Sequence, residues 1–102
     1  MRIEISSFAQ RQLQAGYRFY ASQSDGLGDY FLDSMMADVE SLHIHAGVHA
    51  VFFGNYHRLL ARRFPYSVYY RIERDTIRIY AIFDNRRNPD LIRQRLTRRR
   101  EP

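Results

Sequence analysis

The hydrophobic residues of this 102-residue chain change their spacing near its middle, and that change limits the folds it can adopt. Over residues 7–45 they recur every three or four positions, the period of an amphipathic helix. Over residues 56–83 they alternate with polar residues, the period of a half-buried strand. Helices followed by strands predict an α+β fold whose helices cover one face of an antiparallel sheet. A chain of this length has room for one core, so we expect residues 1–102 to form a single domain.

Two helices joined by a short turn are predicted in the first half. The first helix covers residues 7–22 and begins at a capping box, with Ser7 as the cap and Gln10 as its partner three residues later. The glycine-rich segment 25–28 forms the turn. The second helix covers residues 28–45, and because the connection is short we expect an antiparallel helical hairpin.

A sheet of about four strands is predicted, formed by residues 2–5, 56–63, 66–72 and 76–83. The last three strands are joined by short turns and form an antiparallel meander, whereas residues 46–54 are expected to be a loop. On the last strand, one face should carry Ile77, Ile79 and Ala81. The helical hairpin covers one face of the sheet, so the other face should be basic and aromatic, with Tyr69, Arg71, Arg78 and Tyr80.

A short basic helix is predicted after the sheet. Asn88 is a favourable helix cap, and Pro89 is a favourable first residue for a helix over residues 89–98. Residues 98–100 are consecutive arginines that we expect to be solvated.

The charges are distributed unevenly along the chain, which has sixteen arginines and no lysine. Residues 1–50 hold three arginines and six acidic residues, a net charge of −3, whereas residues 51–102 hold thirteen arginines and five acidic residues, a net charge of +8. A GC-rich genome would favour arginine over lysine everywhere, but it would not concentrate arginine in one half. The asymmetry therefore indicates an anionic partner for the second half, and arginine suits bidentate contact with phosphate or carboxylate.

Six arginines are the predicted target- or anion-binding residues: Arg58, Arg62, Arg71, Arg78, Arg86 and Arg87. Arg86 and Arg87 precede the last helix, where free backbone N–H groups favour an anion. The alternative is that one of them pairs with a neighbouring aspartate and only fixes the helix. Arg58 and Arg62 share a face of the first meander strand, where they either bind a partner or protect a solvated edge.

The composition excludes several kinds of site. Without cysteine the chain has no disulfide, no thiolate metal site and no cysteine nucleophile. The histidines at 43, 45, 49 and 57 do not by themselves indicate zinc, because a His-x-His spacing is uninformative alone and a zinc site needs three or four converging ligands. A general acid–base role for His49 and His57 is a weaker alternative. We therefore predict no metal, no cofactor and no catalytic residue. The sequence has no signal-peptide-like run and no apolar stretch of about 20 residues, so we expect a cytoplasmic protein with no membrane partner.

Four segments carry a family resemblance: Gly26-Leu27-Gly28 with Phe31, Arg63 to Tyr70, Ile79 to Phe83, and Arg86-Arg87-Asn88-Pro89. Together, over about residues 3–96, they resemble the RelE/ParE toxin superfamily of bacterial type II toxin–antitoxin modules. They are more similar to the ParE branch and its neighbouring plasmid-stabilisation proteins than to RelE. The resemblance implies an N-terminal strand, a helical hairpin on an antiparallel sheet and a short C-terminal basic helix.

The resemblance also implies a function, namely a growth-inhibiting toxin that a cognate antitoxin neutralises in a hetero-oligomer. RelE-like members cleave mRNA on the ribosome, whereas ParE-like members bind DNA gyrase and are not nucleases. Ser67 and Ile92 stand where the nuclease branch has a catalytic arginine and a tyrosine, Asp84 replaces an occasional histidine, and Arg86 or Arg87 matches a second catalytic arginine. This pattern favours a ParE-like gyrase inhibitor. The alternatives are a RelE-like ribosome-dependent mRNA endoribonuclease and a regulatory relative that acts only with its antitoxin at operator DNA.

Overall fold

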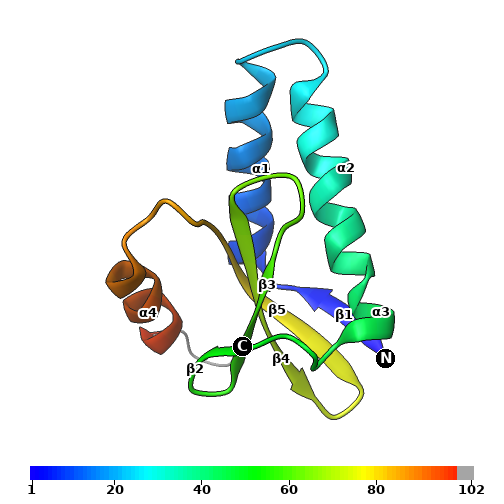
Figure 1. Ribbon diagram of the computed structural model, residues 1–102, viewed down its shortest axis with the longest axis vertical. Coiled ribbons are helices and arrows are strands. Elements are labelled where there is room, and N and C mark those ends of the chain that lie inside the picture. Colours follow the sequence, from blue (N-terminus) through cyan, green and yellow to red (C-terminus); the bar gives the residue numbers. More distant parts are fainter. Residues whose placement is uncertain (99–102) are drawn as a thin grey trace.

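A computed structural model describes residues 1–98, and the side chains of the arginine run at 98–100 lie outside the described part. The described residues form four helices and five strands, in this order (Figure 1): β1 (Arg2–Ile5), α1 (Ser7–Ala21), α2 (Leu27–Glu40), α3 (Leu42–His45), β2 (Val51–Phe53), β3 (Tyr56–Leu60), β4 (Tyr66–Glu73), β5 (Thr76–Asp84) and α4 (Pro89–Arg98). The α+β architecture and the helical hairpin predicted from the sequence are therefore confirmed. None of the described helices is long and apolar enough to span a membrane.

The sheet has five strands in the order β1-β5-β4-β3-β2 and is mixed rather than antiparallel throughout. β1 runs parallel to β5, with Glu4 opposite Arg78, while the other neighbours are antiparallel. The prediction of about four strands missed β2, because its three residues fall in the segment 46–54 that was expected to be a loop. β2 forms one edge of the sheet and β1 the other.

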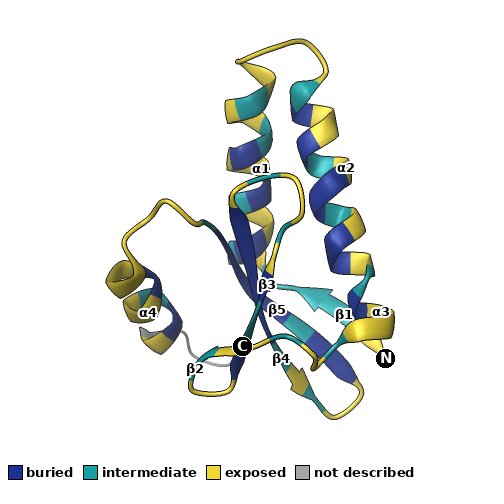
Figure 2. Ribbon diagram, in the orientation of Figure 1, coloured by how far each residue is buried: buried dark blue, intermediate teal, exposed yellow. Residues whose placement is uncertain are grey.

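The hairpin of α1 and α2 covers one face of the sheet and forms the larger core. Its apolar stripe meets side chains of β3, β4 and β5, and the fully buried members include Phe31, Met35, Val68, Tyr70 and Ile79. Figure 2 shows the buried positions on the two helices facing the strands, while the outer faces and the upper connection are exposed. Tyr70 is therefore a core residue, as the sequence predicted.

The second face of the sheet is covered by α4, so the prediction of an open aromatic face was wrong. Tyr69 and Tyr80 are each 1% exposed and pack with Ile92 and Leu96 in a second core cluster. The amphipathic pattern of α4 explains this burial, because Ile92 and Leu96 lie one turn apart on the side facing the sheet, whereas Leu91 is exposed. Arg71 and Arg78 remain partly exposed on this face, beyond α4.

A bulge in β5 changes which side chains share a face. Tyr69 pairs with Ala81 and Tyr70 pairs with Ile79, so Tyr80 is an extra residue between the two pairs. Beyond a bulge the alternation of side chains is shifted by one position. Ala81 consequently belongs to the core under α4 and not, as predicted, to the face of Ile77 and Ile79.

The helix ends differ slightly from the prediction. The N-cap of α1 is Ser6 rather than Ser7, because the Ser6 hydroxyl accepts a hydrogen bond from the backbone N–H of Ala9. The second helix ends at Glu40, and residues 42–45 form the separate short helix α3. The predicted cap at Asn88 is confirmed, since its side-chain oxygen accepts the backbone N–H of Asp90 at 2.8 Å.

Candidate functional site

Two adjoining hollows form a groove between α1 and α4, which we call the α1–α4 groove. Their volumes are about 260 and 410 Å³, and Phe83 and Arg87 line both. α1 lines one side with Phe8, Arg11, Gln12, Gly16 and Phe19, and α4 lines the other with Leu91, Ile92, Gln94 and Arg95. The groove thus combines an apolar floor with arginines along its length.

The floor is built where β5 extends beyond its neighbour β1. The pairing of the two strands ends at Ile5 and Ile79, which leaves later N–H groups of β5 without a strand partner. Gln12, one turn after Phe8 on α1, replaces that partner by accepting the N–H of Ile82 at 2.6 Å. Phe8 also meets the ring of Phe83 edge-on, with centroids 5.8 Å apart. The first two turns of α1 therefore fix the end of β5.

Two arginines on this groove lie against its aromatic floor. The guanidinium carbon of Arg95 is 3.9 Å from the ring centre of Phe8, and that of Arg87 is 5.9 Å from the ring centre of Phe83. The Nε atom of Arg95 is buried and has no hydrogen-bond partner among the described residues. Neither side chain forms an ion pair within the described part of the chain. Both guanidinium groups lie against aromatic rings, and Arg87 also feels the charge of Asp84 without forming an ion pair with it, so both remain able to bind an anion.

Arg86 differs from its neighbour because it is already paired. Its guanidinium hydrogen-bonds both carboxylate oxygens of Asp84, and its backbone N–H donates to the same carboxylate at 2.9 Å. The hydrogen bond with Arg86 lowers the pKa of Asp84, and the same contact raises the pKa of Arg86. The sequence left open that one of these arginines pairs with a neighbouring aspartate, and Arg86 does so. Arg86 lines one of the two hollows of the groove while bound to Asp84, whereas Arg87 lines both hollows and forms no ion pair in the described chain.

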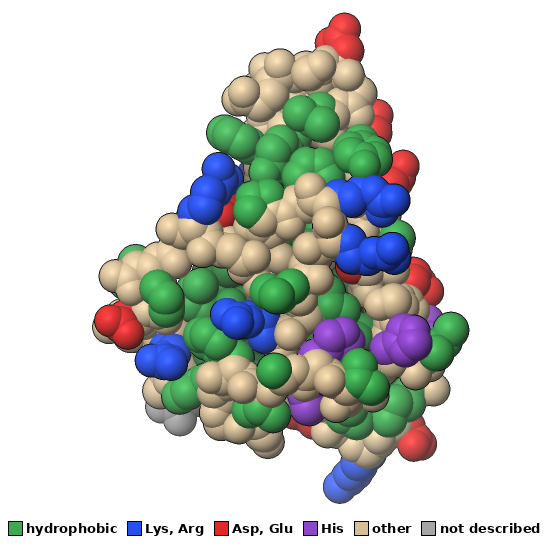
Figure 3. Space-filling model, in the orientation of Figure 1, with side chains coloured by type: hydrophobic (Ala, Val, Ile, Leu, Met, Phe, Trp, Pro, Cys, Tyr) green, Lys and Arg blue, Asp and Glu red, His purple; other side chains and the backbone are tan. Residues whose placement is uncertain are grey.

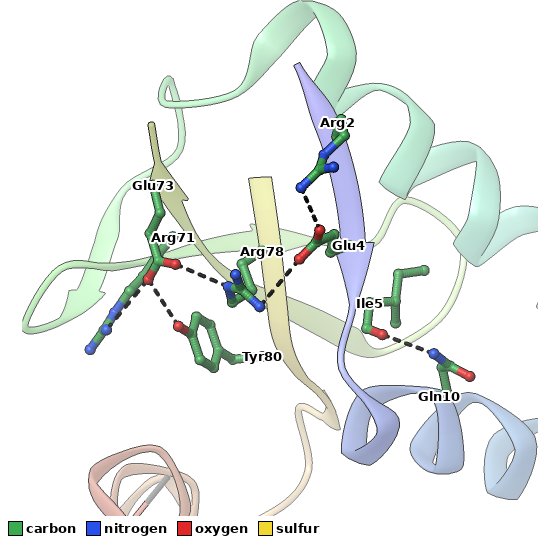
Figure 4. A network of polar contacts seen from close by, with 8 residues as sticks. All are labelled: Arg2, Glu4, Ile5, Gln10, Arg71, Glu73, Arg78 and Tyr80. Atoms are coloured by element: carbon green, nitrogen blue, oxygen red, sulfur yellow. Dashed lines mark hydrogen bonds and ion pairs between the residues drawn. The ribbon is translucent and has the colours of Figure 1, made fainter. Parts of the chain in front are cut away.

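Arg71 and Arg78 belong to an ion-pair network at the opposite end of the sheet (Figure 4). Arg78 contacts Glu73 at 3.0 Å and Glu4 at 3.2 Å, and Arg71 lies 3.8 Å from Glu73. Tyr80 donates a hydrogen bond to the second oxygen of Glu73 at 2.9 Å. Partial burial opposes ionisation of Glu73, but the hydrogen bonds from Tyr80 and Arg78 outweigh it and lower the pKa of that carboxyl. Carboxylates therefore largely balance these two predicted site arginines.

Arg58 and Arg62 are placed apart from each other. The side chain of Arg58 lies over the ring of Phe52 at 5.0 Å and hydrogen-bonds the phenol of Tyr69. Arg62 follows the end of β3, where its backbone N–H donates to the buried carboxylate of Asp38 and its side chain is exposed. The six predicted arginines consequently do not form one site. They are divided among the α1–α4 groove, the Glu73 network, Phe52 and the end of β3.

Ser67 and Ile92 cannot contact a substrate in this structure. Ser67 is 0% exposed, and its hydroxyl donates a hydrogen bond to the side-chain oxygen of Asn85. Ile92 is 4% exposed and belongs to the core under α4. At the two positions where the nuclease branch carries functional side chains, this chain therefore has structural ones. Among the described residues, histidines and carboxylates also form no cluster that could hold a metal.

Sequence reasoning missed Arg11 and Arg95, which line the groove with Arg87. A signal for Arg95 was present, because it adjoins the buried Leu96 at the border of the apolar stripe of α4. Arg11 and Arg95 line the same hollow because α1 and α4 approach each other there, where Arg95 lies over the ring of Phe8. No local pattern in the sequence predicts that α1 and α4 approach each other.

Comparisons with known proteins are consistent with this architecture. No family model matches the chain, and no curated protein matches its sequence. Its fold is of the RelE/ParE type. Among solved structures it is similar to a chain of the "Chromosomal ParDE TA system from P. aeruginosa", with a TM-score of 0.73, 21% sequence identity, and coverage of 82% of this chain and 95% of that chain. The similarity confirms the fold that the four sequence segments predicted.

Proposed function

We propose that this protein is the toxin of a type II toxin–antitoxin pair, of the ParE-like kind, and that it acts in the cytoplasm. The observation that carries the proposal is the fold it shares, over 82% of its length, with a chain of the P. aeruginosa ParDE TA system. The excess of arginine after residue 50 adds support, since a growth inhibitor of this kind needs a surface for its target and its antitoxin. No cofactor and no metal take part in the proposed activity.

The antitoxin is proposed to cover the α1–α4 groove. A partner segment with apolar residues on one side and carboxylates on the other would place the former on Phe8 and Phe83 and the latter beside Arg87 and Arg95. The buried, unpartnered Nε atom of Arg95 supports this choice, because an unpaired buried polar group is costly and a carboxylate would satisfy it. Binding there would give a toxin–antitoxin hetero-oligomer.

DNA gyrase is the proposed target, and the toxin binds it without performing chemistry. Burial of Ser67 and Ile92 favours this over ribosome-dependent mRNA cleavage, because neither residue can stabilise charge on a scissile phosphate. Asp84, which replaces a histidine of the nuclease branch, is bound to Arg86 with its pKa lowered, so it is a poor proton donor near neutral pH.

Two assays on purified protein test the target. The protein should inhibit supercoiling of a relaxed plasmid by gyrase while leaving mRNA on translating ribosomes intact in primer extension. Arg87→Ala should weaken inhibition, whereas Arg63→Ala, which removes an exposed charge next to the β3–β4 turn, should not. Codon-specific cuts in the mRNA together with normal supercoiling would instead support the RelE-like endoribonuclease.

A further inference from the structure

Arg58 and Arg93 approach one aromatic side chain from two different elements. Arg58 extends from β3 and Arg93 from α4, and their guanidinium carbons lie 5.0 and 5.5 Å from the ring centre of Phe52 on β2. Phe52 is half-buried and meets Tyr69 edge-on at 5.2 Å. Figure 3 shows basic side chains set among hydrophobic ones over the region where α4 and the β2–β3 hairpin lie.

The two positive charges at this site are poorly balanced. Arg93 lies 4.0 Å from Asp90, whose side chain is 78% exposed, and within the described residues Arg58 forms no ion pair. Two guanidinium groups near the same ring repel each other, and the faces of an aromatic ring offset that repulsion only in part. An oxyanion placed between them would be attracted by both and could accept several N–H donors at once. The arrangement is therefore suited to hold an anion.

The neighbouring residues indicate which anion fits. Phe53, also half-buried, stacks parallel to Tyr56 with centroids 6.4 Å apart, so further aromatic surface adjoins the site. In the α1–α4 groove, Arg87 and Arg95 add two further arginines, which lie against Phe83 and Phe8 and form no ion pair in the described chain. Arginines that alternate with aromatic side chains suit single-stranded nucleic acid, because the bases can stack on the aromatic rings while the arginines contact the phosphates of the backbone.

We propose that Arg58 and Arg93, beside Phe52, form a binding site for a phosphate group of single-stranded nucleic acid. We expect binding to require guanidinium groups and not merely two positive charges, because each planar guanidinium can donate two hydrogen bonds to the same phosphate. It binds without cleaving. It also does not depend on whether the chain is toxic, so it can be measured on the purified protein alone.

The test is fluorescence anisotropy with labelled single-stranded RNA and DNA of matching sequence, and with a labelled poly-glutamate peptide of similar charge. The double variant Arg58→Gln/Arg93→Gln should lower affinity about tenfold or more, and the slope of log K against log salt should become shallower by about 0.7, the contribution of one phosphate contact on a single strand. Arg58→Lys/Arg93→Lys keeps the charge and should still lose most of the affinity. Comparing the RNA and DNA probes shows which of the two the site prefers.

The matched control is Arg18→Gln/Arg63→Gln, which removes the same charge from exposed positions on α1 and after β3. It should change affinity by no more than about twofold, as expected for a general charge effect screened by salt. Thermal melts must show that all variants are folded. Equal losses in the control and the Arg58/Arg93 variant, an unchanged salt slope, or binding of poly-glutamate as tight as that of the oligonucleotides would each overturn the proposal.

Discussion

The phenolic oxygen of Tyr70 lies 2.6 Å from Nδ1 of His49 and accepts the backbone N–H of Gly47 at 3.0 Å. His57 stacks on the same ring with centroids 5.1 Å apart, and its own Nδ1 lies 2.9 Å from the carbonyl oxygen of His49. One buried tyrosine of β4 therefore holds the segment between α3 and β2 against the sheet. The apolar ring and the hydroxyl of Tyr70 have separate roles that substitution can distinguish.

Replacing Tyr70 by phenylalanine should cost much less stability than replacing it by alanine. Tyr70→Phe removes the hydrogen bonds to Gly47 and His49 and should lower the free energy of unfolding by about 0.5–1.5 kcal/mol per bond lost. Tyr70→Ala also opens a cavity in the main core and should cost about 3–5 kcal/mol. Urea unfolding of both variants measures the difference. Equal losses would mean that the hydroxyl, and not the packed ring, supplies the stability at this position.

Stability should decline as the solution becomes mildly acidic, with His49 contributing. Burial is the main cause that lowers the pKa of His49 below its ordinary value of 6.5, and the charges of His57 and His45 act in the same direction. Below about pH 6.5 the unfolded chain thus binds more protons at this position than the folded chain does, so stability is lost as the pH falls through the folded pKa. His49→Gln should show a weaker pH dependence of the free energy of unfolding between about pH 7.5 and 5. Identical profiles for both proteins would rule out this contribution.

Gly28→Ala should destabilise the helical hairpin. A Cβ atom at Gly28 would lie 2.8 Å from the Cβ of Ala21 and 2.9 Å from the carbonyl oxygen of Tyr17, and the backbone of α1 cannot move aside cheaply. Overpacking of this kind costs about 1–3 kcal/mol. Gly54→Asn is the control, because Gly54 has a φ of 56° in open space, and asparagine tolerates that conformation. If chemical denaturation shows no loss for Gly28→Ala, α1 and α2 are less closely packed in solution.

The adjacent residues Arg86 and Arg87 should respond differently to truncation. Arg87→Ala removes a guanidinium that has no ion pair in the described chain from the α1–α4 groove and should strongly reduce toxicity, while the melting temperature changes little because exposed charges contribute only about 0–1 kcal/mol. Arg86→Ala removes a group that Asp84 already binds, so more of the toxicity should remain. Viable counts beside thermal melts compare the two. Loss of folding in Arg87→Ala would make that arginine structural, and full toxicity would make it a solvated charge.

Strong periodicity made most of the fold predictable. Both long helices, the three meander strands and the helix after Asn88 follow from local spacing and capping residues. β2 was missed because three residues are too few to show a period, and Ala81 was misplaced because the bulge at Tyr80 is a property of strand pairing. Such features depend on which strands meet, and a single sequence does not contain that information.

The candidate site was less predictable, because ion pairing between distant residues decides which arginines remain unpaired. Glu4 reaches Arg78 only because β1 and β5 are parallel neighbours in that register, although 74 positions separate them in the sequence. Likewise, Tyr80 is buried because α4 crosses back over the sheet. The pair Arg86 and Asp84 is local, and there the sequence did suggest the contact as an alternative.

Growth of a bacterial culture after induction of this chain alone tests the toxin assignment most directly. The toxin account predicts arrest soon after induction, with recovery when the cognate antitoxin is produced at the same time. Tyr70→Ala provides the unfolded control and should leave growth unaffected. Uninterrupted growth in cells that accumulate the folded, soluble wild-type chain would contradict the assignment.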